Sequence, residues 1–207
     1  MNRRFLACLL FTLSLSSLAS AQTSPGATGK PASSPAWLPR GAMVGVSLRG
    51  DDRGETAFAA QARLQWQVPF YRGRVDSLSL LIEPLAAYTF AYPATVVEDR
   101  NVDMRALRLF SLLVGVAYRS RPERGLEWGF QVGTGPAWYA ARFTGGEKTR
   151  ESYFVGLLDG RLQLGYNFGA YSLGVGVGYS DRYNHRRTSL ARSYVGGLHL
   201  GLYLEWR

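Results

Sequence analysis

The residues best suited to chemistry in this sequence are two histidines and a set of carboxylates and arginines set within apolar segments. His185 lies in the run "DRYNHRRTSL", in which Ser189 follows four residues later, and His199 lies in "GGLHLGLYLEWR". Neither histidine has a His, Asp or Glu partner at the spacing of metal ligands, and no glycine-rich phosphate loop opens a helix. The sequence therefore predicts no metal ion and no cofactor.

The charged residues alternate with apolar ones, so the segments that carry them have two different faces. In residues 58–68, Leu64 and Trp66 share one face while Arg63 and Gln65 share the other. A period of two predicts β-strands with one apolar face. This pattern occurs in eight segments, which are residues 42–48, 58–68, 78–92, 108–118, 126–140, 154–168, 171–179 and 194–206.

The polar faces carry small residues, such as Gly174, Gly176 and Gly178, rather than the Lys, Glu and Thr of a solvated face. Several segments are also longer than ordinary strands of about five or six residues. A tilted membrane strand needs about 9–11 residues. We therefore expect an all-β fold, an eight-stranded antiparallel up-and-down transmembrane β-barrel, rather than a soluble sandwich or a lipocalin-like barrel.

Aromatic residues collect at the two ends of the predicted strands. With the first strand rising from the periplasm, the lower girdle contains Trp66, Trp128, Tyr166 and Trp206, and the upper girdle contains Tyr88, Tyr92, Trp138 and Tyr179. Two aromatic girdles around an aliphatic band are typical of outer-membrane barrels. The connections agree, because those at the lower end are short and those at the upper end are longer and charged.

Over residues 41–207 the chain resembles the small eight-stranded outer-membrane barrels of the OmpA and OmpX type. In that superfamily the last strand alternates apolar residues and ends on an aromatic residue that the barrel-assembly machinery recognises. Leu202, Leu204 and Trp206 follow this pattern, although Arg207 comes after the tryptophan. The resemblance implies a monomer that meets the barrel-assembly machinery through its C-terminal strand.

The first 21 residues resemble a secretory signal peptide. Arg3 and Arg4 precede an apolar stretch, and residues 19–21 read Ala-Ser-Ala, a pattern that signal peptidase cleaves. Cys8, the only cysteine, lies in this segment, so the mature chain is expected to have no disulfide and no thiolate site. We expect export to the outer membrane of a Gram-negative cell.

Residues 22–40 are rich in Pro, Ser, Gly and Ala, which predicts a disordered tail between residues 1–21 and the barrel of residues 41–207. The chain has a formal net charge of +9, carried almost entirely by arginine. An exported basic protein is expected to meet lipid and lipopolysaccharide phosphates, which guanidinium groups bind well, rather than nucleic acid.

The polar strand faces should line the barrel interior, where charges must pair because unpaired burial costs several kcal/mol. We expect Arg63 and Arg161 to pair with carboxylates from the set Glu83, Glu127, Asp159 and Glu205. The predicted interior polar set is Arg63, Glu83, Arg119, Glu127, Gln131, Tyr139, Asp159, Arg161, His199, Tyr203 and Glu205. Such a network is either a structural polar core or the lining of a narrow, porin-like channel.

Two prolines, Pro84 and Pro136, lie within predicted strands. A proline has no N–H to donate to the hydrogen-bond ladder, and a closed barrel has no free edge to accommodate it. A β-bulge is therefore expected at each proline.

The upper loops contain two further binding patterns. The fourth loop, "SDRYNHRRTSLARS", carries Arg182, Arg186, Arg187 and Arg192, which are either a solvated surface or contacts for lipopolysaccharide phosphates. Arg49-Gly50-Asp51 follows the first strand; in an exposed loop this tripeptide can bind integrins, and the same residues also suit a plain turn.

Enzymatic barrels of this size offer an alternative reading. Lipid A deacylases of the PagL type use a His and a Ser two positions apart on the lipid-facing wall, whereas His185 is followed by two arginines and His199 points inward by parity. A PagP-like acyltransferase would need an acyl-sized hole in the core. We therefore predict a non-enzymatic barrel with a role in envelope integrity or surface interaction through its outer loops, with a lipid A-modifying enzyme and a narrow channel as alternatives.

Overall fold

A computed structural model describes residues 38–50, 56–91, 94–97, 100–120, 124–144, 149–184 and 189–206. The predicted signal peptide and residues 22–37 of the predicted tail lie outside these described residues. Arg40, the last residue of that tail, is held by the barrel. Its N–H donates to the carbonyl of Gln65 (2.6 Å), and its carbonyl accepts from the N–H of Trp206 (3.0 Å).

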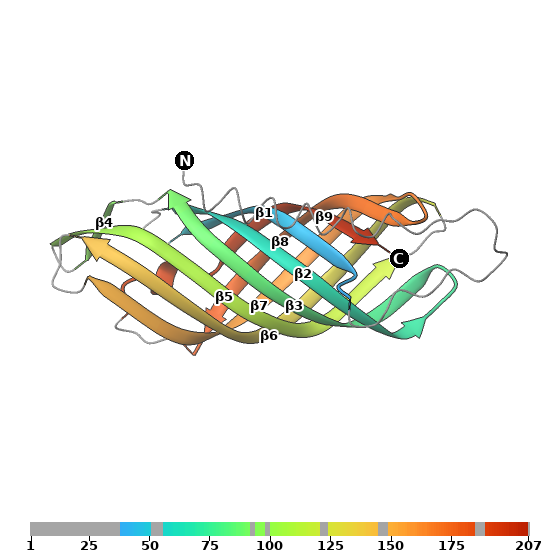
Figure 1. Ribbon diagram of the computed structural model, residues 1–207, viewed down its shortest axis with the longest axis horizontal. Helices are drawn as coiled ribbons and strands as arrows, with labels where there is room; N and C mark the ends of the chain where they lie inside the picture. Colours follow the sequence, from blue (N-terminus) through green and yellow to red (C-terminus); the bar gives the residue numbers. More distant parts are fainter. Residues whose placement is uncertain are drawn as a thin grey trace. The chain divides into compact units, whose positions relative to one another are not determined.

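The chain forms nine β-strands in the described regions. They are β1 (Gly41–Gly50), β2 (Thr56–Arg72), β3 (Asp76–Ala91), β4 (Ala94–Val97), β5 (Arg100–Ser120), β6 (Gly125–Thr144), β7 (Arg150–Asn167), β8 (Tyr171–Tyr183) and β9 (Gly197–Trp206). The strands are antiparallel and most pair with their sequence neighbours (Figure 1). β1 pairs with β9 and β3 pairs with β5, so eight strands close into an up-and-down barrel, and β4 adds a short ladder on β5.

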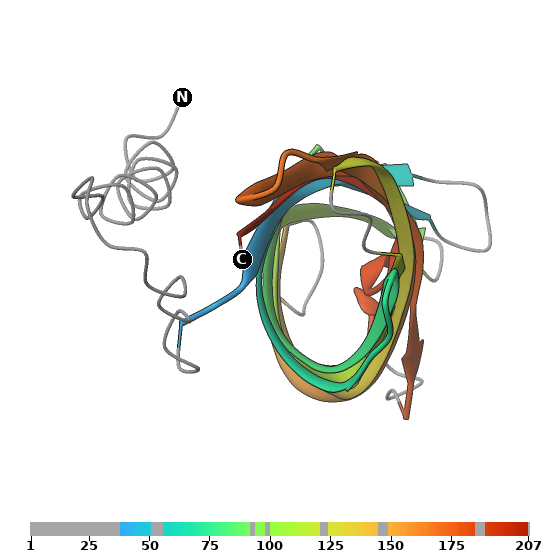
Figure 2. The same ribbon diagram turned by 90° about the vertical axis from the view of Figure 1, so that its right-hand side faces the viewer.

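Alternation along the strands separates an inner face from an outer face, as the sequence pattern requires. On β5, Leu113 and Ala117 are buried inside the barrel, whereas Leu112, Val114 and Val116 are 41–48 % exposed on its outer wall. The same alternation runs round the ring, which Figure 2 shows closed when viewed along the barrel. The barrel is therefore apolar outside, with charged and polar groups inside.

The connections differ at the two ends of the barrel. Short connections join β2 to β3, β5 to β6 and β7 to β8, and the longest connection, between β8 and β9, lies at the other end. We call the end with the three short connections the short-turn end, and the opposite end the long-loop end. β4 lies at the long-loop end, opposite the end at which β9 finishes (Figure 1).

The prediction of a β-bulge at Pro84 and at Pro136 is wrong. The β3–β5 pairing continues without a shift through Pro84, and the β6–β7 pairing continues without a shift through Pro136. On their other sides, two consecutive residue pairs are missing from the ladder next to each proline, with the register unchanged beyond the gap. Loss of the proline N–H is thus absorbed as a local gap on one side.

Register shifts occur instead near the strand ends. They lie between Phe58 and Ala59 and between Pro69 and Tyr71 in the β2–β3 ladder, and between Met104 and Ala106 in the β5–β6 ladder. An extra residue at such a point increases the local twist and bend of the strand. These irregularities therefore lie outside the middle of the strands.

The last strand begins later than the pattern predicted. Tyr194, assigned by alternation to the outer wall, lies in the 3-10 helix η2 (Arg192–Tyr194) and is buried. Gly196 and Gly197, with φ of 119° and 121°, then lead the chain into β9. Because L side chains rarely adopt this backbone conformation, the two glycines permit the chain to turn back from the barrel mouth.

No helix in the described part of the chain is long and apolar enough to cross a membrane.

Candidate functional site

The structure places all eleven residues of the predicted interior set on the inner wall, and each is at most 3 % exposed. They come from six of the eight barrel strands. Their charged members form two groups. We name these groups the central cluster and the lower cluster.

The central cluster is built around Arg63 of β2. Its guanidinium Nη1 lies 2.8 Å from Glu83 Oε1, and its two terminal nitrogens bind the two oxygens of Asp159 at 2.9 and 3.0 Å. Arg161 donates to Glu83 Oε2 at 2.5 Å and to Gln131. Two carboxylates and two guanidinium groups thus neutralise one another, as charges removed from water must.

Asp159 also meets His199 and Ser180. His199 Nε2 lies 3.0 Å from Asp159 Oδ2, and Ser180 Oγ donates to the same oxygen at 2.6 Å. In a hydrolytic triad the histidine stands between the serine and the acid, whereas here the acid stands between the other two. The geometry is therefore that of a buried structural network rather than of an activated serine.

The lower cluster lies near the short-turn end and is built around Arg119 of β5. Arg119 pairs with Glu205 and with Glu127 Oε1 (3.3 Å). Glu127 also accepts hydrogen bonds from Tyr203 Oη (3.1 Å) and Ser172 Oγ (3.0 Å). Arg119 therefore takes the two carboxylates that the sequence analysis also offered to Arg63 and Arg161.

Several of these contacts cross the barrel from wall to wall. β2 and β7 are four strands apart in either direction round the ring, and the Arg63–Asp159 pair joins them. β5 and β9 are also four strands apart, and the Arg119–Glu205 pair joins them. An eight-stranded barrel is just wide enough for side chains to fill. Ion pairs therefore obstruct the interior at two levels.

The inner wall is apolar towards the long-loop end, whereas the predicted interior set contains polar residues. A buried cluster there includes Leu107, Leu109, Tyr139 and Leu157. Residues 189–195, which we call the inward segment, add Ala191, Tyr194 and Val195 to it. Figure 2 shows η2 within the outline of the ring. The inward segment therefore packs against the inner wall within this mouth of the barrel.

Glu151 at the start of β7 anchors the inward segment. Its carboxylate accepts hydrogen bonds from Ser189 Oγ (2.8 Å), the N–H of Ala191 (2.7 Å) and the N–H of Leu190 (3.2 Å). Tyr139 Oη lies 2.5 Å from Ser189 Oγ. One carboxylate thus satisfies two backbone donors that would otherwise be buried without partners.

Replacing this carboxylate should open the mouth. In the purified folded barrel, we expect Glu151→Ala to raise the rate of trypsin cleavage after Arg192 at least about tenfold, because hydrogen bonds to a charged group contribute about 1.5–3 kcal/mol each. Glu151→Gln, which keeps one acceptor oxygen, should give a smaller increase. Cleavage after Arg72 provides the internal reference, and an unchanged ratio of the two cleavage rates would contradict the anchoring role.

The loop arginines offered as lipopolysaccharide contacts are only partly described. Arg186 and Arg187, together with His185, lie outside the described residues. Arg182 and Arg192 are half-buried, and the Arg182 guanidinium donates to the carbonyl of Ser193 at 3.5 Å. The structure brings these two residues to the same mouth of the barrel.

The adhesion reading of Arg49-Gly50-Asp51 does not fit the position of its arginine. Arg49 is 2 % exposed and points into the barrel. Its guanidinium donates to Ser47 Oγ (3.2 Å) and to the carbonyl of Tyr194 (3.3 Å), so it supports the inward segment. Asp51 lies outside the described residues.

The residues assigned to the aromatic girdles lie on the outer wall wherever their side chains are described. Trp128, Tyr166, Tyr88, Trp138 and Tyr179 are exposed, Trp66 and Trp206 are half-buried, and Tyr92 lies outside the described side chains. Near the short-turn end, Tyr118 contacts both Trp128 and Phe130, with ring centroids 5.2 and 5.5 Å apart.

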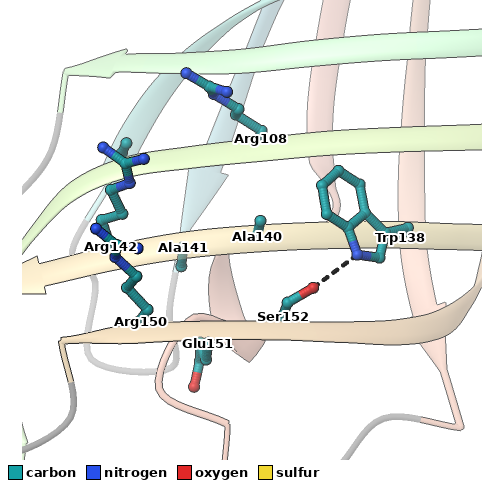
Figure 3. Close-up of a pocket in the computed structure, with 9 residues that line it drawn as sticks. Arg108, Trp138, Ala140, Ala141, Arg142, Arg150, Glu151 and Ser152 are labelled. Carbon is teal, nitrogen blue, oxygen red and sulfur yellow. Dashed lines mark hydrogen bonds between the residues drawn. The ribbon is translucent and has the colours of Figure 1, made fainter.

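Three arginines that strand parity alone does not bring together lie in one group on the outer wall. Arg108 of β5, Arg142 of β6 and Arg150 of β7 line a pocket of about 390 Å³ together with Trp138 and Ser152 (Figure 3). Trp138 Nε1 donates to Ser152 Oγ at 2.7 Å. The arginines are 34 and 8 residues apart in sequence, so only the strand register reveals that they are neighbours.

Comparison by sequence finds no matching protein family and no matching curated protein. Comparison by fold finds Neisserial surface protein A (NspA), which is 10 % identical, covers 80 % of this chain and 94 % of its own, and has a TM-score of 0.50. It also finds the outer membrane enzyme PagL (12 % identity, 79 % and 98 % coverage, TM-score 0.47). A third is Ail, the attachment invasion locus protein of Yersinia pestis (13 % identity, 80 % and 95 % coverage, TM-score 0.42).

The likeness to NspA concerns the fold alone. Together with the strand pairing, it confirms the expected fold, an eight-stranded antiparallel up-and-down β-barrel. At this identity it assigns no activity, ligand or partner to the chain.

Proposed function

We propose that this protein is a non-enzymatic integral protein of the Gram-negative outer membrane that contributes to envelope integrity or to surface interactions through its long-loop end. The observation that carries the proposal is the distribution of polarity in the barrel. Charged groups are paired inside, and large apolar side chains cover the outside. This is the reverse of a water-soluble barrel.

The outer wall supports a lipid environment. Leu200 and Leu202 on β9 and Leu162 on β7 are 54–61 % exposed, and similar residues continue round the ring. Soluble monomers rarely expose contiguous apolar patches larger than a few hundred Å². A hydrocarbon environment removes this cost, and closure of the barrel leaves no unpaired strand edge facing lipid.

The connections support an orientation with the short-turn end in the periplasm and the long-loop end outside the cell. In this orientation the apolar alternation of β9, from Leu198 to Leu204, is available to the barrel-assembly machinery during insertion. Arg182 and Arg192 then lie at the external mouth, beside the headgroups of lipopolysaccharide. We therefore propose the barrel-assembly machinery and lipopolysaccharide as partners of this protein.

The alternatives receive less support. A narrow channel needs a continuous path, whereas the Arg63–Asp159 and Arg119–Glu205 pairs cross the interior. A deacylase of the kind considered above needs a histidine on the lipid-facing wall. Among the described residues His199 is the only histidine, and it is buried inside. A polar core with a structural role is therefore favoured.

The proposal is tested by expressing the full chain and separating inner and outer membranes by density. We expect the protein in the outer-membrane fraction, resistant to extraction with urea, and an unchanged mass spectrum of lipid A relative to cells with an empty vector. Recovery in a soluble fraction would overturn the location. A lost or added acyl chain would overturn the non-enzymatic role.

A further inference from the structure

The pocket that contains Arg108, Arg142 and Arg150 lies on the outer wall near the long-loop end. All three guanidinium groups are exposed, and no acidic residue in the described part of the chain pairs with them. Arg142 and Arg150 are directly opposite each other in the β6–β7 ladder. Like charges in this position repel each other.

Three neighbouring guanidinium groups without acidic partners favour the binding of an anion. Figure 3 shows the three arginine side chains and Trp138 gathered on adjacent strands. Guanidinium groups bind phosphate through paired N–H donors, and a shared anion turns mutual repulsion into attraction. The hydroxyl of Ser152 lies in the same pocket and is a further hydrogen-bond donor for such an anion.

The strand register places this pocket directly above an aromatic row. Phe110, Trp138 and Phe154 lie side by side on β5, β6 and β7, and they are 59 %, 38 % and 74 % exposed. Arg108 lies one outward-facing row higher, and Arg142 and Arg150 lie two rows higher. Outward rows are about 7 Å apart along a strand. The arginines therefore lie just beyond the aromatic row.

A ligand that fits both features has phosphate groups joined to acyl chains. The phosphate lies among the arginines, and the chains descend over Phe110, Phe154 and the aliphatic wall. In the orientation proposed above, this level corresponds to the headgroups of the external leaflet. A free phosphate ion would use the arginines but not the apolar surface below them.

Resting on the proposed outer-membrane location, we propose that Arg108, Arg142 and Arg150 form a binding site for a phosphate of the lipid A moiety of lipopolysaccharide. The site lies on the barrel wall rather than in the fourth loop. Trp138 and Phe154 contact the adjoining acyl region. The protein thus carries a specific glycolipid at one side of the barrel, over β5, β6 and β7.

The test uses the folded full barrel in detergent micelles and two probes, bis-phosphorylated lipid A and the same lipid A without phosphates. We expect the wild type to bind the phosphorylated probe at least about tenfold more tightly than the other. Arg142→Gln combined with Arg150→Gln should remove at least about tenfold of that affinity, because each lost guanidinium contributes charge-assisted hydrogen bonds. Inorganic phosphate at the same concentration should not displace the lipid.

A matched control distinguishes a site from general charge. Arg72→Gln with Arg74→Gln removes two exposed arginines at the short-turn end and should leave the affinity unchanged. Equal losses in both double variants, equal binding of the two lipid probes, or displacement by inorganic phosphate would each overturn the site. Folding is verified by circular dichroism, so a folded barrel that does not bind refutes this inference alone. Absence from the outer membrane refutes the proposed function.

Discussion

Arg63→Met should destabilise the barrel by about 3–5 kcal/mol, the cost of removing one partner from a buried ion pair. The guanidinium binds both oxygens of Asp159 and one oxygen of Glu83. Glu83 keeps Arg161 in the variant, whereas Asp159 keeps only Ser180 and the ring of His199. The energetic cost therefore falls mainly on Asp159.

Equilibrium unfolding by urea in phospholipid vesicles measures this effect. Adding Asp159→Asn to Arg63→Met should restore part of the lost stability, because it removes the charge that the first substitution leaves without its main partner. Arg72→Met, an exposed arginine at the short-turn end, should change the stability by no more than about 0.5 kcal/mol. A loss below about 1 kcal/mol for Arg63→Met would show that the central cluster contributes little to stability.

Val114→Arg should cost about 2–4 kcal/mol, the penalty for an arginine at the middle of a lipid-facing barrel wall. Val114 lies on β5 midway between Phe110 and Tyr118, and its side chain is 46 % exposed. The substitution changes no contact inside the barrel, because the Val114 side chain points away from the interior. The penalty arises from transferring a guanidinium into hydrocarbon.

A second arginine substitution provides the depth control. Leu126→Arg lies at the start of β6, opposite Tyr166 in the β6–β7 ladder, and should cost no more than about 1 kcal/mol. Both variants are compared by urea unfolding in the same vesicles. Equal and small effects at the two positions would indicate that the wall faces water.

Strand parity made much of this fold predictable from sequence. In β7, Asp159, Arg161 and Gln163 lie inside because they share one parity, and Leu158, Leu162 and Leu164 lie outside because they share the other. Side chains on a strand alternate strictly, so a polar position within an apolar pattern identifies the inner wall. Alternation predicts which face of each strand a residue occupies, but it does not predict how far neighbouring strands are shifted along one another.

The choice of partners inside the barrel depends on that stagger. Arg119, rather than Arg63 or Arg161, takes Glu127 and Glu205 because all three lie near the short-turn end, at the same level of the barrel. Heights within a barrel depend on strand tilt and shear, which cannot be read from single segments. The arginine pocket on the outer wall was missed for the same reason.

The inward segment shows a second limit of prediction from the sequence. Tyr194 shares the sequence parity of Leu198 and Leu200, yet it folds into the barrel mouth together with Val195. Gly196 and Gly197 mark the start of β9, and this glycine pair was an available signal in the sequence. The apolar inner wall near this mouth was also visible in sequence, since β5 carries Leu107 and Leu109 on the face opposite to Phe110.

A spin-label scan of β5 in outer membranes tests whether the outer wall of the barrel faces lipid. Cys8 is the only cysteine, so Cys8→Ser permits single cysteines at 112, 113, 114, 116 and 117. We expect labels at 112, 114 and 116 to be accessible to oxygen but shielded from a water-soluble nickel chelate. Labels at 113 and 117 should be shielded from both. Ready access of the chelate to 112, 114 and 116 would show instead that the wall faces water.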